Sequence, residues 1–249
     1  MSGDLISLRM LLVGGAPADE DMWREGATQA SVPVDFESGD ASAAKVALSR
    51  GGVDFCVLVS ALDDIDKTSV IKAALARRPA PLIFASAPRG SARPDHVNGV
   101  LPIPGDAVEA RKIVEVCVRA RMPTQVLVAA DSDSLRGVVR KTLIASRFDL
   151  DVHEAVDGAD TLDRLRKGNF GLVFLDSNMP GLNGADISRG IKRERPNVAV
   201  VMMMMSSAPA PGGTGRPQVS DALASLKKPF YPADVDAVLE RYFGLSEPD

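Results

Sequence analysis

Short apolar runs alternate with helix-compatible stretches along the whole chain. The runs are LRMLLVG, VDFCVLV and APLIFAS in the first half, then TQVLVAA, GLVFLD and VAVVMMMM in the second. Helices cover both faces of a parallel sheet, so its strands are apolar without interruption. The pattern therefore predicts an α/β fold with doubly wound parallel sheets.

The two halves resemble each other at a shift of about 115 residues. LLVGGAP lies over VLVAADS, VDFCVLVS over FGLVFLD, and IFASAP over MMSSAP. A helix-compatible segment at 106–121 is followed by the break Met122-Pro123-Thr124. We expect two five-stranded domains in tandem, 1–121 and 124–249. The short joint has no Gly/Ser tract, which favours docked or semi-rigid domains.

Composition and charge narrow the classes of function. The formal net charge is −4 and aromatic residues make up 4% of the chain, so direct nucleic-acid binding is not expected. No run approaches the roughly 18 apolar residues of a membrane span, and the N-terminus lacks the pattern of a signal peptide. We expect a cytoplasmic protein without membrane insertion. Cys56 and Cys117 lie in apolar runs and are expected to be buried thiols.

Polar residues follow the apolar runs of the second half. Open α/β sheets place their sites beyond the carboxyl ends of the strands, so these side chains should converge at one edge. The residues concerned are Asp131, Asp176, Ser206, Ser207 and Lys228.

Three stretches of the second half carry a family resemblance. These are HEAVDGADTLDRL, LVFLDSNMPGLNG, and KKPF followed by a helix-compatible segment. Together with the separations of Asp131, Asp176 and Lys228, they resemble the chemotaxis-type receiver domain of two-component response regulators over roughly 124–245. The resemblance implies a flavodoxin-like fold for each domain and a phosphorylated aspartate.

The resemblance also implies roles for individual residues. A carboxylate attacks a phosphoryl group only when nearby cations neutralise the charges involved. Asp176 would be the phosphoacceptor, with Lys228 as the fixed ammonium. Mg²⁺ would be held by Asp131, Asp176 and the backbone carbonyl of Asn178. The hydroxyl that contacts the bound phosphoryl group would come from Ser206, with Ser207 as the alternative.

The sequence departs from the family pattern in three places. Ala130 stands where receivers carry the first of two adjacent acids, so we expect weakened Mg²⁺ binding, with Asp133 as a partial substitute. The Pro/Gly-rich segment 208–218 takes the place of a helix and is expected to form a loop. Ser225 replaces the aromatic switch residue.

Two residues of the LVFLDSNMPGLNG stretch are expected to shape the loop after Asp176. Pro180 would fix its own φ, and Gly184 would permit a positive φ.

The first half keeps the pattern of the fold without this chemistry. When the first half is aligned with the second, Gly15 and Ala16 stand at the positions of the metal-binding acids, and Ser60 stands at the position of the phosphoacceptor. No lysine lies within 79–111, and Ser86 is retained at the serine position. We therefore expect a degenerate pseudo-receiver that docks a partner or forms a homodimer, with a plain spacer domain as the alternative.

Two rival motifs account for less of the chain. Residues 131–135 resemble the haloacid-dehalogenase nucleophile motif, but that reading leaves the stretch around Asp176 and KKPF unexplained. LLVGGAP lacks the G-x-G-x-x-G spacing of a dinucleotide loop. Neither alternative displaces the receiver interpretation.

The sequence thus predicts a phosphorelay response regulator. Asp176 would accept phosphate from a histidine kinase or phosphotransfer protein, and the output would be contact with a downstream protein partner, without a separate effector domain. We expect no enzyme activity beyond self-phosphorylation and autodephosphorylation. The alternative is a scaffold or adaptor that works without phosphorylation.

Overall fold

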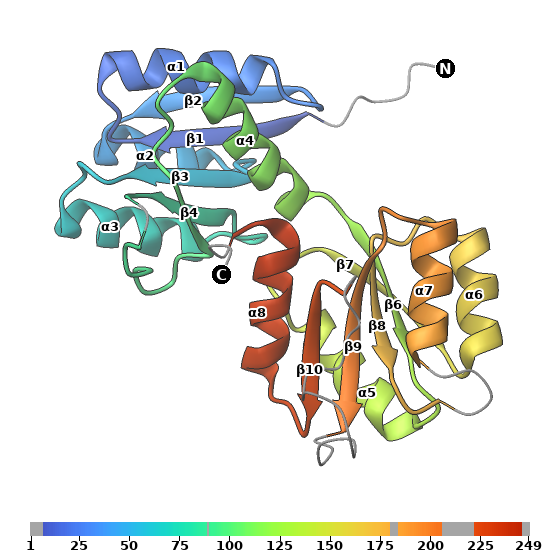
Figure 1. The fold of residues 1–249 in the computed structure, drawn as a ribbon. Coiled ribbons are helices and arrows are strands. Elements are labelled where there is room, and N and C mark those ends of the chain that lie inside the picture. The colour runs from blue at the N-terminus through green and yellow to red at the C-terminus, as the bar shows by residue number, and fades with distance from the viewer. Residues whose placement is uncertain (1–6, 89, 180–183, 206–221, 246–249) are drawn as a thin grey trace. The chain divides into compact units, whose positions relative to one another are not determined.

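The computed structural model describes residues 7–88, 90–179, 184–205 and 222–245. The chain divides into two compact units (Figure 1). The first comprises 1–122 with 243–249, and the second comprises 123–242. Each unit contains one five-stranded sheet in which all paired strands are parallel. Among the described residues, no helix has the length and apolar character needed to cross a membrane.

The sheet of the first unit has the strand order β2-β1-β3-β4-β5. Helices α1 and α4 pack together, as do α2 and α3. The strands are β1 (Leu8–Val13), β2 (Val34–Gly39), β3 (Phe55–Val59), β4 (Leu82–Ser86) and β5 (Gly99–Leu101). The helices are α1 (Pro17–Thr28), α2 (Ala41–Arg50), α3 (Asp64–Leu75) and α4 (Ala107–Arg121).

The sheet of the second unit has the strand order β7-β6-β8-β9-β10, which is the same topology as in the first unit. Its strands are β6 (Thr124–Ala129), β7 (Leu150–Ala155), β8 (Leu172–Asp176), β9 (Ala199–Met205) and β10 (Ala224–Lys228). Its helices are α5 (Asp133–Ile144), α6 (Gly158–Lys167), α7 (Gly184–Glu194) and α8 (Pro232–Phe243). Both sheets have the flavodoxin-like order, which confirms the predicted fold class.

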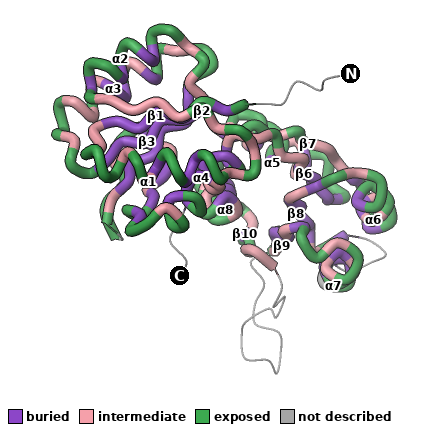
Figure 2. Tube along the Cα trace, turned by 90° about the horizontal axis from the view of Figure 1, so that it is seen from above, coloured by how far each residue is buried: buried purple, intermediate pink, exposed green. Residues whose placement is uncertain are grey.

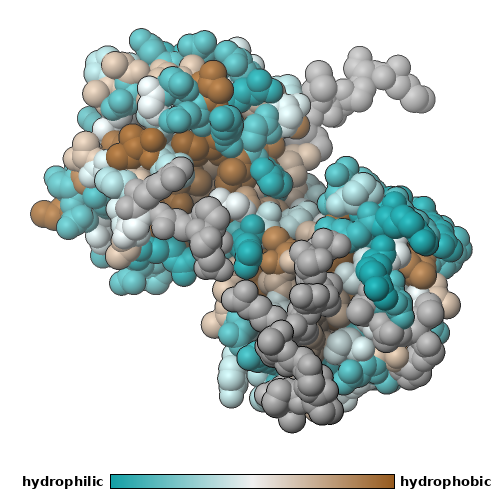
Figure 3. All heavy atoms as spheres, viewed as in Figure 1, coloured by the Kyte–Doolittle hydropathy of each residue, from teal (hydrophilic) through white to brown (hydrophobic). Residues whose placement is uncertain are grey.

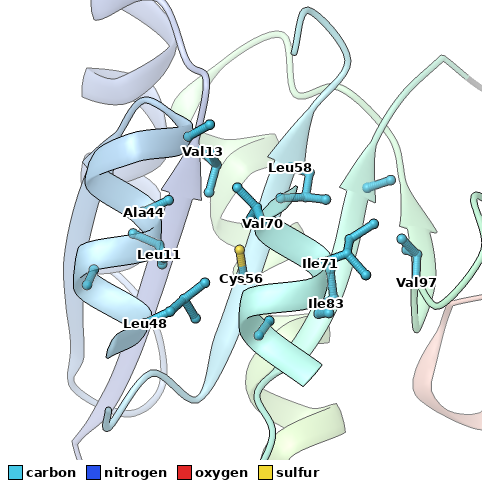
Figure 4. Close-up of a cluster of buried hydrophobic side chains, with 14 residues drawn as sticks. Leu11, Val13, Ala44, Leu48, Cys56, Leu58, Val70, Ile71, Ile83 and Val97 are labelled. Atoms are coloured by element: carbon cyan, nitrogen blue, oxygen red, sulfur yellow. The ribbon is translucent and has the colours of Figure 1, made fainter. Parts of the chain in front are cut away.

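The central strands account for the buried cores. Every residue of β3 and β8 is buried, and the tube in Figure 2 shows buried central strands beneath helices with exposed outer faces. Figure 4 shows one such core in the first unit, where Leu11 and Val13 of β1 face Ala44 and Leu48 of α2. Hydrophilic residues cover α6 and α7 in Figure 3.

The two cysteines are fully buried free thiols, as expected from their apolar surroundings. Burial raises the pKa of Cys56 to about 12 and also raises the pKa of Cys117, because the interior disfavours the thiolate. These thiols act as small hydrophobic side chains.

Several helices begin with a side-chain cap that the sequence supplies. Each capping oxygen accepts a hydrogen bond from the backbone N–H three residues later, which satisfies a donor left free by helix geometry. The capping residues are Asp40, Asp63, Asp106, Ser132 and Asp157.

Candidate functional site

A buried carboxylate and an ammonium group form an ion pair at the carboxyl edge of the second sheet. Asp176 is the last residue of β8 and is 3% exposed. Lys228, the last residue of β10, places its Nζ 2.6 Å from Asp176 Oδ2. A buried carboxylate requires such a partner, so the pair fixes the orientation of both side chains.

The backbone after β8 also contacts the Asp176 carboxylate. The N–H of Asn178 donates to Asp176 Oδ1 at 3.0 Å. The N–H of Gly184 donates to the carbonyl of Ser177 at 3.3 Å, which draws the start of α7 toward the end of β8.

Gly184 is needed for close approach rather than for a positive φ. A Cβ atom there would lie 2.7 Å from Ser177 Cα and 2.8 Å from the carbonyl oxygen of Asp176. Gly184 does not have a positive φ, so the reason predicted from the sequence is wrong. The missing side chain leaves room for the Asp176 backbone.

Asp131 follows β6 at the same edge and is exposed. Within the described part of the chain, no hydrogen bond or ion pair joins its carboxylate to Asp176 or Lys228, and no three metal-ligating side chains form a cluster. Asp131 is therefore an exposed carboxylate at the same edge of the sheet as the buried pair.

Arg136 is a buried charged residue that the sequence analysis missed. It is 6% exposed, and its guanidinium donates to the carbonyl oxygens of Ala130 at 2.6 Å and Asp131 at 3.2 Å. It also pairs with Glu154 at 3.1 Å and with Asp133. Arg136 therefore fixes the loop that carries Asp131. Its helical spacing from the buried Val139 and Leu143 was the available signal.

The remaining residues predicted at this edge are only partly described. Strand β9 runs beside β8 with Met203 opposite Asp176, and it continues through Met204 to Met205. Ser206, Ser207, Pro180 and the segment 208–218 lie outside the described residues. Ser225, within β10, is exposed.

The faces of the strands correct the alignment of the first unit by one residue. Leu11 and Cys56 pack in one core cluster with residues of α2 and α3, as Leu127 and Val173 pack with residues of α6 and α7. With these residues aligned, Val59 rather than Ser60 corresponds to Asp176. In the same register Gly14 and Gly15, rather than Gly15 and Ala16, correspond to Ala130 and Asp131.

The same comparison moves two further positions. Ser86 pairs with Val59 as Met203 pairs with Asp176, so Ser86 does not correspond to Ser206. Leu101 pairs with Ser86 as Leu226 pairs with Met203, which places Ile103 where the second unit has Lys228.

Apolar and backbone contacts occupy the first unit's carboxyl edge. A Cβ atom on Gly14 would lie 2.9 Å from the Leu62 side chain and 3.3 Å from Val59. Lys67 donates to the carbonyl of Ser60 at 3.3 Å and lies 3.6 Å from Asp64. Val59 therefore stands where the second unit has Asp176, and the Leu62 side chain and the Lys67 contact lie at the same edge.

Sequence comparisons identify a family for the second unit and relatives of part of the chain. The protein-family model described as the response regulator receiver domain matches residues 126–240. Chemotaxis protein CheY-3 of Vibrio cholerae serotype O1 is 27% identical over 124 residues, covering 48% of this chain and 91% of the relative. The nitrate/nitrite response regulator protein NarP of Escherichia coli is 29% identical over 86 residues, covering 34% of this chain and 40% of NarP.

A solved structure resembles both units together. The structure of a probable two-component system response regulator/GGDEF domain protein covers 95% of this chain and 98% of its own, with a TM-score of 0.57 and 18% identity. At that identity the likeness establishes the tandem fold and nothing about activity.

Proposed function

Because residues 126–240 belong to the response regulator receiver family of two-component signalling, we propose that Asp176 accepts a phosphoryl group and so controls protein contacts. The observation that carries the proposal is the buried Asp176 carboxylate, held 2.6 Å from the Lys228 ammonium at the sheet edge. A fixed cation there lowers the repulsion between the carboxylate and an incoming phosphoryl group.

The proposed donor is a phosphohistidine of a histidine kinase or phosphotransfer protein. The P–N bond of the donor breaks as a P–O bond forms to a carboxylate oxygen of Asp176, and the freed imidazole takes up a proton. The Lys228 side chain pairs with the new phosphoryl oxygens. A hydroxyl beyond the end of β9, from Ser206 or Ser207, would then contact the acyl phosphate.

The residues at this edge fit a weak magnesium site. Asp131 and Asp176 provide carboxylates and Asn178 a backbone carbonyl, and Mg²⁺ keeps waters in its remaining positions. When bound, the ion would neutralise phosphoryl oxygens during transfer. Ala130 provides no third carboxylate, and Arg136 holds a positive charge against its carbonyl. Both features favour a lowered Mg²⁺ affinity.

The first unit is proposed to be a receiver-like domain that has lost the reaction. Gly14, Gly15, Val59 and Ile103 supply neither carboxylate nor ammonium at the aligned positions. We assign it a role in docking a protein partner or a second copy of the chain. We further infer that the protein acts in the cytoplasm, where the kinase would reach Asp176.

The test is binding of beryllofluoride, a phosphoryl mimic, in the presence of Mg²⁺. We expect saturable NMR shifts at Asp176, Asn178 and Lys228 in the full chain, and their loss in Asp176→Asn. The matched control is Asp163→Asn, which removes an exposed carboxylate paired with Lys167 on α6 and should leave binding unchanged. Persistence of the shifts in Asp176→Asn would contradict the proposal.

A scaffold that works without phosphorylation is the second candidate. It is favoured by the neutral Ala130, whose carbonyl already accepts a hydrogen bond from Arg136 at 2.6 Å. In that case millimolar Mg²⁺ and beryllofluoride would produce no saturable shift. Partner binding would then be equal for the wild type and for Asp176→Asn.

A further inference from the structure

A small basic hollow lies at the amino edge of the first sheet, at the opposite end of the strands from the positions discussed above. It has a volume of about 120 Å³ and lies among the α2–β3 loop, the α3–β4 loop and the end of α4. Its charged lining consists of Arg77, Arg78, Arg121 and Asp54.

The one carboxylate in this lining is already satisfied. Asp54 Oδ1 lies 3.2 Å from Arg121 Nε, and Asp54 Oδ2 accepts the backbone N–H of Arg9 at 2.9 Å. Arg78 donates to the carbonyls of Leu75 and Arg77, at 2.8 and 2.7 Å. Two positive charges therefore remain without a countercharge among the lining residues.

Arg77 is the residue best placed to receive a ligand. It is half-buried, and its guanidinium has no hydrogen-bond or ion-pair partner in the part of the chain that the structure describes. Holding a cation in a recess without a partner costs solvation free energy, which an oxyanion would restore.

Two consecutive glycines let guanidinium groups approach the backbone beside this hollow. Gly51 and Gly52 have φ values of +80° and +79°. A Cβ on Gly51 would lie 3.3 Å from the Arg77 guanidinium, and one on Gly52 would lie 3.3 Å from that of Arg9. The loop conformation therefore leaves space that arginine side chains use.

The matching loop of the second unit is filled instead. By strand register, Val53 corresponds to Phe170, which is 7% exposed. A Cβ atom on Gly168 would collide with the Phe170 ring, and Arg195 donates to the Gly168 carbonyl at 2.8 Å. The open, arginine-lined recess is thus a feature of the first unit, not a consequence of the shared fold.

We propose that this recess binds a single phosphoryl group, either as inorganic phosphate or as a phosphate monoester. Sites for drug-sized ligands are about 300–1,000 Å³, so this recess has room for one small group. A phosphoryl group carries about −1.5 to −2 charge near pH 7, which matches the two uncompensated arginines. Planar guanidinium groups bind such oxygens in pairs.

The test is an NMR titration of the full chain with sodium phosphate, against sodium chloride at matched ionic strength. We expect saturable shifts at Gly51, Gly52 and the Arg77 side chain. Arg77→Gln should weaken binding at least tenfold. Arg77→Lys, which keeps the charge and loses the paired donors, should give a smaller loss. Trp23 fluorescence, from the first-unit core, verifies folding of each variant.

The matched control is Arg50→Gln, because Arg50 is exposed, pairs with Glu37 at 3.7 Å and does not line the recess. Its phosphate affinity should equal that of the wild type. Asp176→Asn should also bind normally, which separates this proposal from phosphorylation of the second unit. Phenyl phosphate distinguishes the two ligand sources: binding supports a monoester, and exclusion supports the free ion. Absence of saturable shifts, or unchanged affinity in Arg77→Gln, overturns the proposal.

Discussion

The carboxyl edges of the two sheets share a strand order and differ in chemistry. Where the second unit has Asp176 and Lys228, the first has Val59 and Ile103. The connection after β3 spans residues 60–63, whereas the connection after β8 spans residues 177–183. Replacing a buried ion pair with apolar residues is often neutral or stabilising, so the fold does not require the charged pair. The chemistry at this edge can therefore change while the sheet persists.

The largest expected effect on stability comes from replacing Lys228 with isoleucine, the residue at the aligned position of the first unit. Lys228→Ile leaves Asp176 buried without its cation and should lower the free energy of unfolding of the second unit by about 3 kcal/mol. Urea unfolding, followed through the NMR intensities of β8 amides, measures this change. Trp23, the single tryptophan of the chain, lies in the first unit. The urea concentration at which its fluorescence changes should be the same as in the wild type.

The double variant Asp176→Val with Lys228→Ile replaces both charged residues. It should recover most of the lost stability, since neither charge remains buried alone. A double variant as unstable as Lys228→Ile would show that the two edges are not interchangeable.

The close approach behind Asp176 gives the next effect. Gly184→Ala pushes a methyl group against the Asp176 carbonyl and should cost about 2 kcal/mol by overpacking. The control is Gly137→Ala in α5, where a Cβ meets no atom within 4 Å and should stabilise the helix by roughly 0.5–1 kcal/mol. Thermal unfolding of both variants compares them, and equal shifts would count against the packing argument.

A smaller cost is expected at the aligned position of the first unit. Gly14 has a φ of +83°, so Gly14→Ala should destabilise that unit by about 1.5 kcal/mol. Trp23 fluorescence during urea unfolding reads this change. Gly105→Ala meets only the Glu109 carboxylate at 3.4 Å and should stay within about 0.5 kcal/mol of the wild type. If Gly14→Ala leaves the free energy of unfolding unchanged, a side chain is tolerated at this position.

The smallest effect concerns metal affinity at the second edge. Ala130→Asp restores the acid that receivers carry and should tighten Mg²⁺ binding about tenfold, equivalent to about 1.4 kcal/mol. Ser134→Asp adds the same charge at an exposed position in the first turn of α5 and should change the affinity less. Isothermal titration with Mg²⁺ compares the two variants, and equal affinities would contradict the proposal that Ala130 lowers the Mg²⁺ affinity.

The apolar runs predicted all the central strands and the two-unit organisation of the fold. They did not mark β2, β5 and β7, because edge strands are shorter or only half-buried and lack an uninterrupted apolar pattern. The alignment of the first unit with the second, made from the sequence alone, was also wrong by one residue. Strands buried on both faces have no apolar-polar alternation that could fix their register.

Sequence reasoning brought Asp176 and Lys228 to the same edge correctly, since both end parallel strands. It missed Arg136 because charged residues are normally exposed, and this one is buried by bonds to loop carbonyls formed only after folding. It assigned Gly184 the wrong reason, because the proximity of the Ser177 backbone depends on tertiary structure.

The methionines of β9 differ in exposure, and this difference determines which of them is oxidised first. Met202 and Met203 are 1% and 0% exposed, whereas Met205 is 57% exposed and pairs with Lys228 across the strands. Peroxide should therefore convert Met205 to the sulfoxide first, making it polar while the core thioethers stay reduced. The lesion would lie on the strand end next to Lys228, and methionine sulfoxide reductase could reverse it without unfolding the sheet.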